Sequence, residues 1–191
     1  MNKIIFFSFL LLTVFSKKKD KNDEIYDPGR STLINLNPMN FDTQITNNRA
    51  KQIAFVHFYS PDDNQSDKLK DIFIKLDAEY SGMFKLAGLN CKKYKDLCNK
   101  QSVNEFPTYK IYPPLPAPIM KYEGKLDEKH IISYLGSFVV NKVQELNNNN
   151  FDDFINNKAN IPKILLFSNK KNIPLIFKRL SVEFEVSKIL K

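Results

Sequence analysis

The stretch that decides the fold is Phe58-Tyr59-Ser60-Pro61-Asp62-Asp63-Asn64-Gln65-Ser66-Asp67-Lys68-Leu69, where an apolar strand passes into an amphipathic helix. Residues 52–59 are apolar enough to form a central strand that is covered on both faces. Ser60 is a good helix N-cap, Pro61 suits the first helical position, and the acids that follow complement the helix dipole. From Leu69 to Tyr80 apolar residues recur at helical spacing, which predicts one buried stripe.

Strands and helices alternate over the chain up to residue 140. We expect strands at residues 32–36, 52–59, 84–89, 108–112 and 119–122, a short helix capped by Asn40, the helix from Ser60, a polar helix through Leu97, and a last helix over residues 127–140. The predicted order, β-α-β-α-β-α-β-β-α, is that of an α/β fold with a central mixed sheet flanked by helices.

Two further phrases carry a resemblance to a known family. Val103-Asn104-Glu105-Phe106-Pro107-Thr108 is similar to the "V-x-G-F-P-T" phrase of the protein disulfide isomerase family, and Tyr122-Glu123-Gly124 before the last helix strengthens the match. Residues 31–140 therefore resemble a thioredoxin-like domain of that family, in which a cis-proline, here Pro107, opens a strand. The resemblance, more than the periodicity, predicts the thioredoxin-like fold.

The same resemblance implies that the redox centre is missing. The family's C-x-x-C falls on Asp63, Asn64, Gln65 and Ser66, so neither thiol exists and no disulfide can form there. The family's buried acid, which relays protons to the dithiol, falls on His57. We therefore expect Asp63, Ser66 and His57 to be degenerate positions, and no catalytic residue or cofactor is implied.

Cys91 and Cys98 are the two cysteines of the chain. Family members often carry a pair here that looks structural, so the resemblance implies a structural disulfide, which would contribute roughly 2 to 3 kcal/mol in the loop-entropy model. The alternative is a displaced redox pair, although this spacing lacks the helix-start geometry that lowers a thiol pKa. A structural zinc site needs four ligands, and the chain offers two cysteines and two distant histidines, so no metal is expected.

The family's second functional surface does not depend on cysteines. There, the residue before the cis-proline, here Phe106, exposes backbone groups that pair with an extended substrate strand. With Pro107, Tyr59 and Tyr109 it would form a face that binds unfolded or partner polypeptide. In the alternative interpretation, Pro107 is only architectural.

Two other patterns near the helix start suggest weaker sites. Asp62 and Asp63 form an acidic pair, but adjacent residues on a helical turn point apart, so charge complementing the helix dipole is the better interpretation than acid/base catalysis. Asn64-Gln65-Ser66 is the one N-x-S/T sequon, so Asn64 is a candidate glycosylation site.

The N-terminus predicts secretion. An apolar run over residues 4–15 between Lys3 and a basic triplet is too short to span a bilayer and is typical of a signal peptide, here residues 1–16, although an uncleaved anchor is the alternative. Charged residues 17–30 predict a flexible lead-in. The net charge of +8 is spread and interleaved with acids, so nucleic-acid binding is not expected.

Residues 141–191 start the pattern again. A strand near residues 143–146, a helix from Phe151, a strand at 163–167 and an amphipathic helix from Pro174 predict a partial second thioredoxin-like unit of the form β-α-β-α. The second unit is either packed on the first or the visible part of a longer domain.

These observations predict a redox-inactive, disulfide isomerase-like protein that binds polypeptides as a chaperone, adaptor or scaffold in the endoplasmic reticulum lumen or elsewhere in the secretory pathway. One alternative is a thiol-disulfide oxidoreductase that uses Cys91 and Cys98. The other is a fragment of a larger thioredoxin-domain protein.

Overall fold

A computed structural model describes residues 24–29, 31–63, 65, 69–156, 163–170, 172–183 and, for the backbone, 187–190. Its larger sheet has the strand order β1-β3-β2-β4-β5, with β1 (Ile34–Leu36), β2 (Ile53–Tyr59), β3 (Phe84–Asn90), β4 (Thr108–Tyr112) and β5 (Met120–Lys121). The first three pair in parallel, and β4 and β5 are antiparallel additions. The predicted mixed sheet of a thioredoxin-like fold is confirmed.

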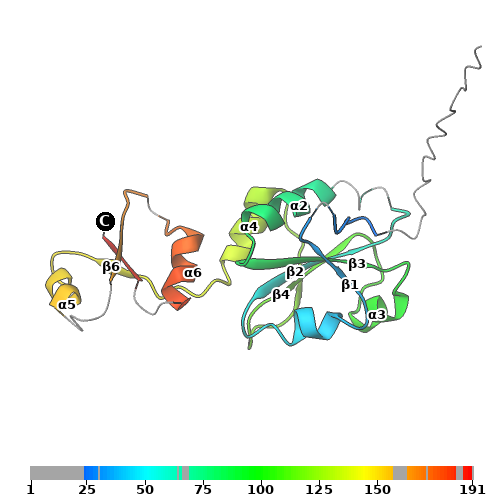
Figure 1. The fold of residues 1–191 in the computed structure, drawn as a ribbon, viewed down its shortest axis with the longest axis horizontal. Helices are drawn as coiled ribbons and strands as arrows, with labels where there is room; N and C mark the ends of the chain where they lie inside the picture. The colour runs from blue at the N-terminus through cyan, green and yellow to red at the C-terminus, as the bar shows by residue number, and fades with distance from the viewer. Residues whose placement is uncertain are drawn as a thin grey trace, which may run out of the picture.

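Helices cover both faces of this sheet (Figure 1). They are η1 (Asp42–Thr46), α2 (Lys70–Glu79), α3 (Lys95–Lys100) and α4 (Glu128–Gly136). Strand β2 is the centre of the domain, and all seven of its residues are buried. Phe55 and Tyr59 pack in the cluster formed with α2 and α4, whereas Val56 and Phe58 pack in the cluster that contains Cys91 and Cys98.

The helix start differs from the expectation. Ser60 does not cap a helix at this point, because residues 60–63 form a turn closed by a hydrogen bond from Asp63 N–H to Ser60 O (3.0 Å). The Asp63 carboxylate then accepts the Gln65 N–H at 3.0 Å. Gln65 is helical, and a carboxylate that accepts the backbone N–H two residues further on is a typical N-cap contact. The cap position is therefore Asp63 rather than Ser60. Helix α2 spans Lys70–Glu79, while Asn64 and residues 66–68 lie outside the described residues.

The lead-in was predicted to be flexible over residues 17–30, and its described part contradicts that. Ile25 is 3% exposed and the Tyr26 side chain is fully buried against α2 and β3. Gly88 makes room for it, since a Cβ atom there would lie 2.4 Å from the Tyr26 ring. Apolar burial therefore outweighs the local charge of this segment, and residues 17–23 lie outside the described part of the chain.

A second, smaller sheet follows, with the order β6-β8-β7 and all pairs parallel. Its elements are β6 (Gln144–Leu146), α5 (Phe151–Asn156), β7 (Ile164–Phe167), α6 (Leu175–Glu183) and β8 (Ser187–Leu190). The sequence pattern predicted no strand after α6, so β8 is an addition to the expected β-α-β-α. The order matches β1-β3-β2 of the first sheet.

An identical turn marks the start of both units. In the first, Asn37 N–H donates to Asn40 Oδ1 (2.8 Å), Met39 N–H to Asn37 Oδ1 (2.9 Å), and Asn40 Nδ2 to Asn35 O (3.1 Å). In the second, Asn147, Asn149 and Asn150 repeat these bonds at 2.8, 2.9 and 3.1 Å, the last of them to Glu145 O. The asparagine tract is therefore the structural counterpart of the first unit's turn.

The two units touch through α4 and α6, which lie side by side in Figure 1. Leu175 packs against the first unit's core, and a Cβ on Gly136 would lie 2.7 Å from its Cδ2. Arg179 Nη1 also donates to Lys51 O at 3.4 Å. Gly136 thus allows the close approach of α6 to α4.

The fit of Tyr26 over Gly88 gives a first prediction. We expect Gly88→Ala to lower the free energy of unfolding by about 1 to 3 kcal/mol, because the new methyl group displaces the Tyr26 ring. Urea denaturation followed by circular dichroism measures it.

A double-mutant cycle that combines Gly88→Ala with Tyr26→Ala supplies the control. In a Tyr26→Ala background the same Gly88→Ala change should cost much less, because the opposing ring is gone. Equal costs in both backgrounds would contradict the packing described here.

Candidate functional site

The candidate site lies where three strands end or begin near one another. Tyr59 ends β2, Asn90 ends β3, and β4 begins at Thr108 after the loop that carries Phe106 and Pro107. The Phe106–Pro107 peptide bond is cis. Thr108 Oγ1 donates to Glu105 O at 2.7 Å, which ties this loop to the start of its own strand.

At the positions that correspond to the family dithiol, the described side chains serve local structure. Asp63 is half-buried and held by its turn, and Asp62 forms an ion pair with Lys92 at 2.7 Å. The two acids therefore have separate partners and do not form an acid/base pair. Ser66 and the glycosylation candidate Asn64 lie outside the described residues.

His57 is fully buried in the centre of β2. Its Nδ1 lies 2.7 Å from the Tyr26 hydroxyl, and its ring stacks on Tyr109 with 4.8 Å between centroids. Burial lowers the pKa of His57 from 6.5 to about 3, so the imidazole is neutral at physiological pH. In this environment His57 acts as an aromatic core residue rather than as a charged proton relay.

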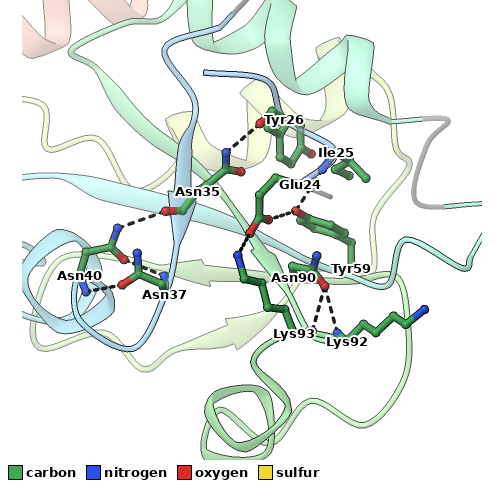
Figure 2. A network of polar contacts seen from close by, with 10 residues as sticks. All are labelled: Glu24, Ile25, Tyr26, Asn35, Asn37, Asn40, Tyr59, Asn90, Lys92 and Lys93. Carbon is green, nitrogen blue, oxygen red and sulfur yellow. Dashed lines mark hydrogen bonds and ion pairs between the residues drawn. The ribbon is translucent and has the colours of Figure 1, made fainter. Parts of the chain in front are cut away.

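A polar network covers the end of β2 (Figure 2). The Tyr59 hydroxyl donates to Glu24 Oε2 at 2.5 Å and accepts the Ile25 N–H at 3.3 Å. Lys93 Nζ reaches the other Glu24 oxygen at 3.3 Å. Burial, followed by the contact with Glu24, raises the pKa of Tyr59. The sequence analysis missed this network, and the available signal was the apolar pair Ile25-Tyr26 within a charged segment.

Asn90 shapes the neighbouring turn of the same network. Its Oδ1 accepts the Lys92 and Lys93 N–H groups at 3.1 and 3.2 Å. From this side-chain-to-backbone turn Lys93 reaches Glu24 (Figure 2). Lys92 of the same turn pairs with Asp62. The turn after β2, the turn after β3 and the N-terminal segment are thereby joined by charge pairs.

The four predicted peptide-binding residues do not share one surface. Tyr59 is fully buried beneath the N-terminal segment, and Tyr109 is 4% exposed because it pairs with His57 across β2 and β4. Burial, and then the Asp63 charge, raises the pKa of Tyr109. Phe106 is 38% exposed and Pro107 is half-buried. Of the four residues predicted to bind peptide, Phe106 is therefore the accessible aromatic side chain.

Cys91 and Cys98 form a disulfide, with 2.03 Å between the sulfurs and 5.7 Å between the Cα atoms. Both are buried, at 3% and 1% exposure, among Phe58, Val103 and other apolar side chains. Cys91 N–H also donates to Tyr59 O at 2.8 Å. The bridge links the end of β3 to α3 and lies in the core rather than on an accessible face.

The described residues contain neither a metal-binding cluster nor a membrane-spanning helix. Within them, no group of three or more His, Cys, Asp or Glu side chains is arranged to hold a metal ion. No helix in that part of the chain has the length and apolar character needed to cross a membrane.

The buried imidazole gives a pH prediction. The unfolded chain binds a proton near pH 6.5, whereas the folded protein does not protonate His57 until about pH 3, so the stabilisation present above pH 6.5 is lost as the pH falls. Between these values, the unfolding free energy should decrease by up to about 1.4 kcal/mol per pH unit more in the wild type than in His57→Phe. Urea denaturation from pH 7 to pH 4 measures both slopes.

Phe41→Leu is the matched control, since Phe41 lies in the apolar cluster on the other face of β2 and the change adds or removes no titratable group. This variant should keep the wild-type slope. A His57→Phe variant with the same slope as the wild type would show that His57 is protonated in the folded protein.

Comparison with known proteins agrees with this architecture. The Thioredoxin family model matches residues 32–137, more than half of the chain. Protein disulfide-isomerase MPD1 of Saccharomyces cerevisiae is 34% identical over 107 residues, which cover 55% of this chain and 33% of that protein. Human DnaJ homolog subfamily C member 10 is 28% identical over 127 residues, which cover 66% of this chain and 15% of that protein.

Solved structures extend the match in fold beyond the first unit. Crystal form II of ERdj5 matches with a TM-score of 0.65 and 17% identity, covering 86% of this chain and 23% of that one. The chain spans 38% of the length of the first curated relative it matches and 15% of several others. From the family match and these relatives, we conclude that the chain belongs to the thioredoxin family as a protein disulfide isomerase-like, thioredoxin-domain protein.

Proposed function

We propose that the chain is a redox-inactive member of its family that binds polypeptides as a chaperone, adaptor or scaffold. Its proposed location is the secretory pathway, with the endoplasmic reticulum lumen as the expected compartment. The observation that carries the proposal is the state of its two cysteines. Both are buried in one disulfide, and residues 58–69, which include the positions corresponding to the family dithiol, contain no cysteine. Thiol-disulfide exchange needs an accessible thiolate, which these residues do not supply.

The geometry of the cis-proline loop supports the second part of the proposal, polypeptide binding. Phe106 keeps 38% of its surface exposed directly before Pro107, where β4 begins with Thr108 opposite Phe58 of β2. An exposed aromatic side chain next to a strand entry suits an extended apolar segment, which adds backbone hydrogen bonds to an apolar contact. The client is therefore an unfolded or partner polypeptide rather than a nucleic acid. The proposed location in the secretory pathway rests on the apolar run at residues 4–15, which is typical of a signal peptide.

The competing function is an oxidoreductase that uses Cys91 and Cys98. Burial of both sulfurs at 3% and 1% exposure opposes it, because a substrate thiolate cannot reach them without local unfolding. A structural role, in which the bridge holds α3 against β3, explains the same pair with no further assumption.

The disulfide gives a direct test. We expect the free-thiol count of the purified native protein to stay at zero in mild dithiol reductant and to reach two only after denaturation, because the core shields both sulfurs. An insulin-reduction assay should show no turnover. Ready opening of the bond in the native state, with activity that Cys91→Ser abolishes, would instead establish the oxidoreductase.

The binding face gives a separate test. Phe106→Ala should weaken binding of a reduced, unfolded insulin B chain roughly tenfold, since truncating a central aromatic anchor commonly has such an effect. Fluorescence anisotropy measures the affinity. Met39→Ala is the control, because Met39 is 90% exposed and lies in the turn after β1, a strand that β3 and β2 separate from β4. Equal affinity of the Phe106→Ala variant and the wild type would refute this face as the binding site.

A further inference from the structure

A hollow lies between the two units, along the contact of α4 and α6. Its volume is about 430 Å³, which is in the range of ligand sites, and such sites are common where domains meet. The first unit contributes Ile132 and Ser133 to its lining, and the second contributes Leu175 and Lys178. We propose that this hollow binds the C-terminal end of a polypeptide, with the terminal carboxylate at Lys178 and an apolar last side chain on Ile132 and Leu175.

The apolar part of the lining accounts for the preferred side chain. Ile132 is 8% exposed, and Leu175 packs against the core of the first unit. Gly136 lies between them in the lining and carries no side chain of its own. These groups offer a short apolar surface, and burying an aliphatic side chain of modest size, such as valine, on it is favourable.

The polar part of the lining consists of unpaired hydrogen-bond donors. Lys178 is half-buried, and within the described part of the chain its Nζ has no ion pair or hydrogen bond. The same holds for the Ser133 hydroxyl, the Asn172 amide and Nδ2 of Asn141, whose Oδ1 accepts the Val143 N–H at 3.1 Å. No described residue of the lining is acidic. Donors around a single cation favour a carboxylate, which accepts hydrogen bonds with both oxygens.

A neighbouring hollow favours a polypeptide over a small acid as the ligand. Its volume is about 570 Å³, and Ser133 and Ser137 line both hollows, so the two meet on the surface of α4. Tyr122 and Tyr134 line the second hollow. A chain that ends at Lys178 would therefore cross the two serines and place its preceding residues beside the tyrosines, which combine apolar contact with a polar group.

The charges of the two hollows set the direction of the bound segment. The second hollow is lined by Lys121 and Lys125 but also by Glu123, which pairs with Lys121 at 3.9 Å. A terminal carboxylate there would be repelled by Glu123. In the first hollow Lys178 has no acid beside it among the described lining residues. The carboxylate is therefore expected at Lys178, and the rest of the segment in the second hollow.

The test uses the full chain and a short peptide. The probe is Gly-Ser-Tyr-Ser-Val with fluorescein at its N-terminus and a free C-terminal carboxylate, and fluorescence anisotropy measures its affinity. We expect saturable binding. Lys178→Gln should weaken it roughly tenfold, and the same peptide with an amidated C-terminus should bind at least tenfold more weakly, because each change removes one partner of the charge pair.

Matched variants separate this site from others. Lys95→Gln removes the same charge from an exposed position of α3, on the other face of the larger sheet, and should leave the affinity unchanged. Ser133→Trp fills the junction of the two hollows and should abolish binding, whereas Asn99→Trp on the exposed side of α3 should not. Phe106→Ala should also have no effect, so this test is independent of that of the cis-proline loop.

Four outcomes would overturn the proposal. The first is equal affinity of the protein for the free and the amidated peptide, and the second is equal affinity of the wild type and Lys178→Gln for the free peptide. The third is N-acetylvaline that binds as tightly as the peptide, which would assign the hollow to a small carboxylic acid. The fourth is no saturable binding of the peptide up to about 1 mM.

Discussion

Strand β2 is the constraint on which the rest of the structure depends. Its seven residues are buried, its two edges are paired, and its two faces divide the domain into two apolar clusters. Any polar side chain on this strand is therefore shielded from water. His57 is accommodated as a neutral ring that stacks on Tyr109, and the Tyr59 hydroxyl donates a hydrogen bond to Glu24. The family's proton-relay position thus becomes part of the packing.

The proposed loss of redox chemistry is compatible with the retained fold, because the two depend on different groups. Asp63, the described residue at the first dithiol position, makes local hydrogen bonds with Ser60 and Gln65, so its side chain can change without disturbing β2. The cis-proline loop, the disulfide between β3 and α3, and the charge pairs of Asp62 and Glu24 hold the same end of the sheet together. The frame is therefore maintained by groups outside the positions that correspond to the family dithiol.

Much of this could be predicted from the sequence, and the failures have physical causes. The run at residues 52–59 and the spacing of its neighbours predicted the sheet, because a strand buried on both faces needs an unbroken apolar pattern. The absence of a dithiol was visible directly. The burial of Tyr59 could not be predicted from the sequence, because it depends on Ile25 and Tyr26. These two residues lie in a charged segment and are ordered by contacts with distant strands. Strand β8 was missed because its partners β6 and β7 are far away in sequence.

The packing of Tyr26 against Gly88 also affects how the chain folds while it is being synthesised. The segment with Ile25 and Tyr26 is synthesised before β3, and its binding place on that strand is completed more than sixty residues later. Strand β1 depends on the same partner, because β3 is its neighbour in the sheet. Until β3 has been made, the nascent chain presents Ile25, Tyr26 and β1 to the cell's own folding factors.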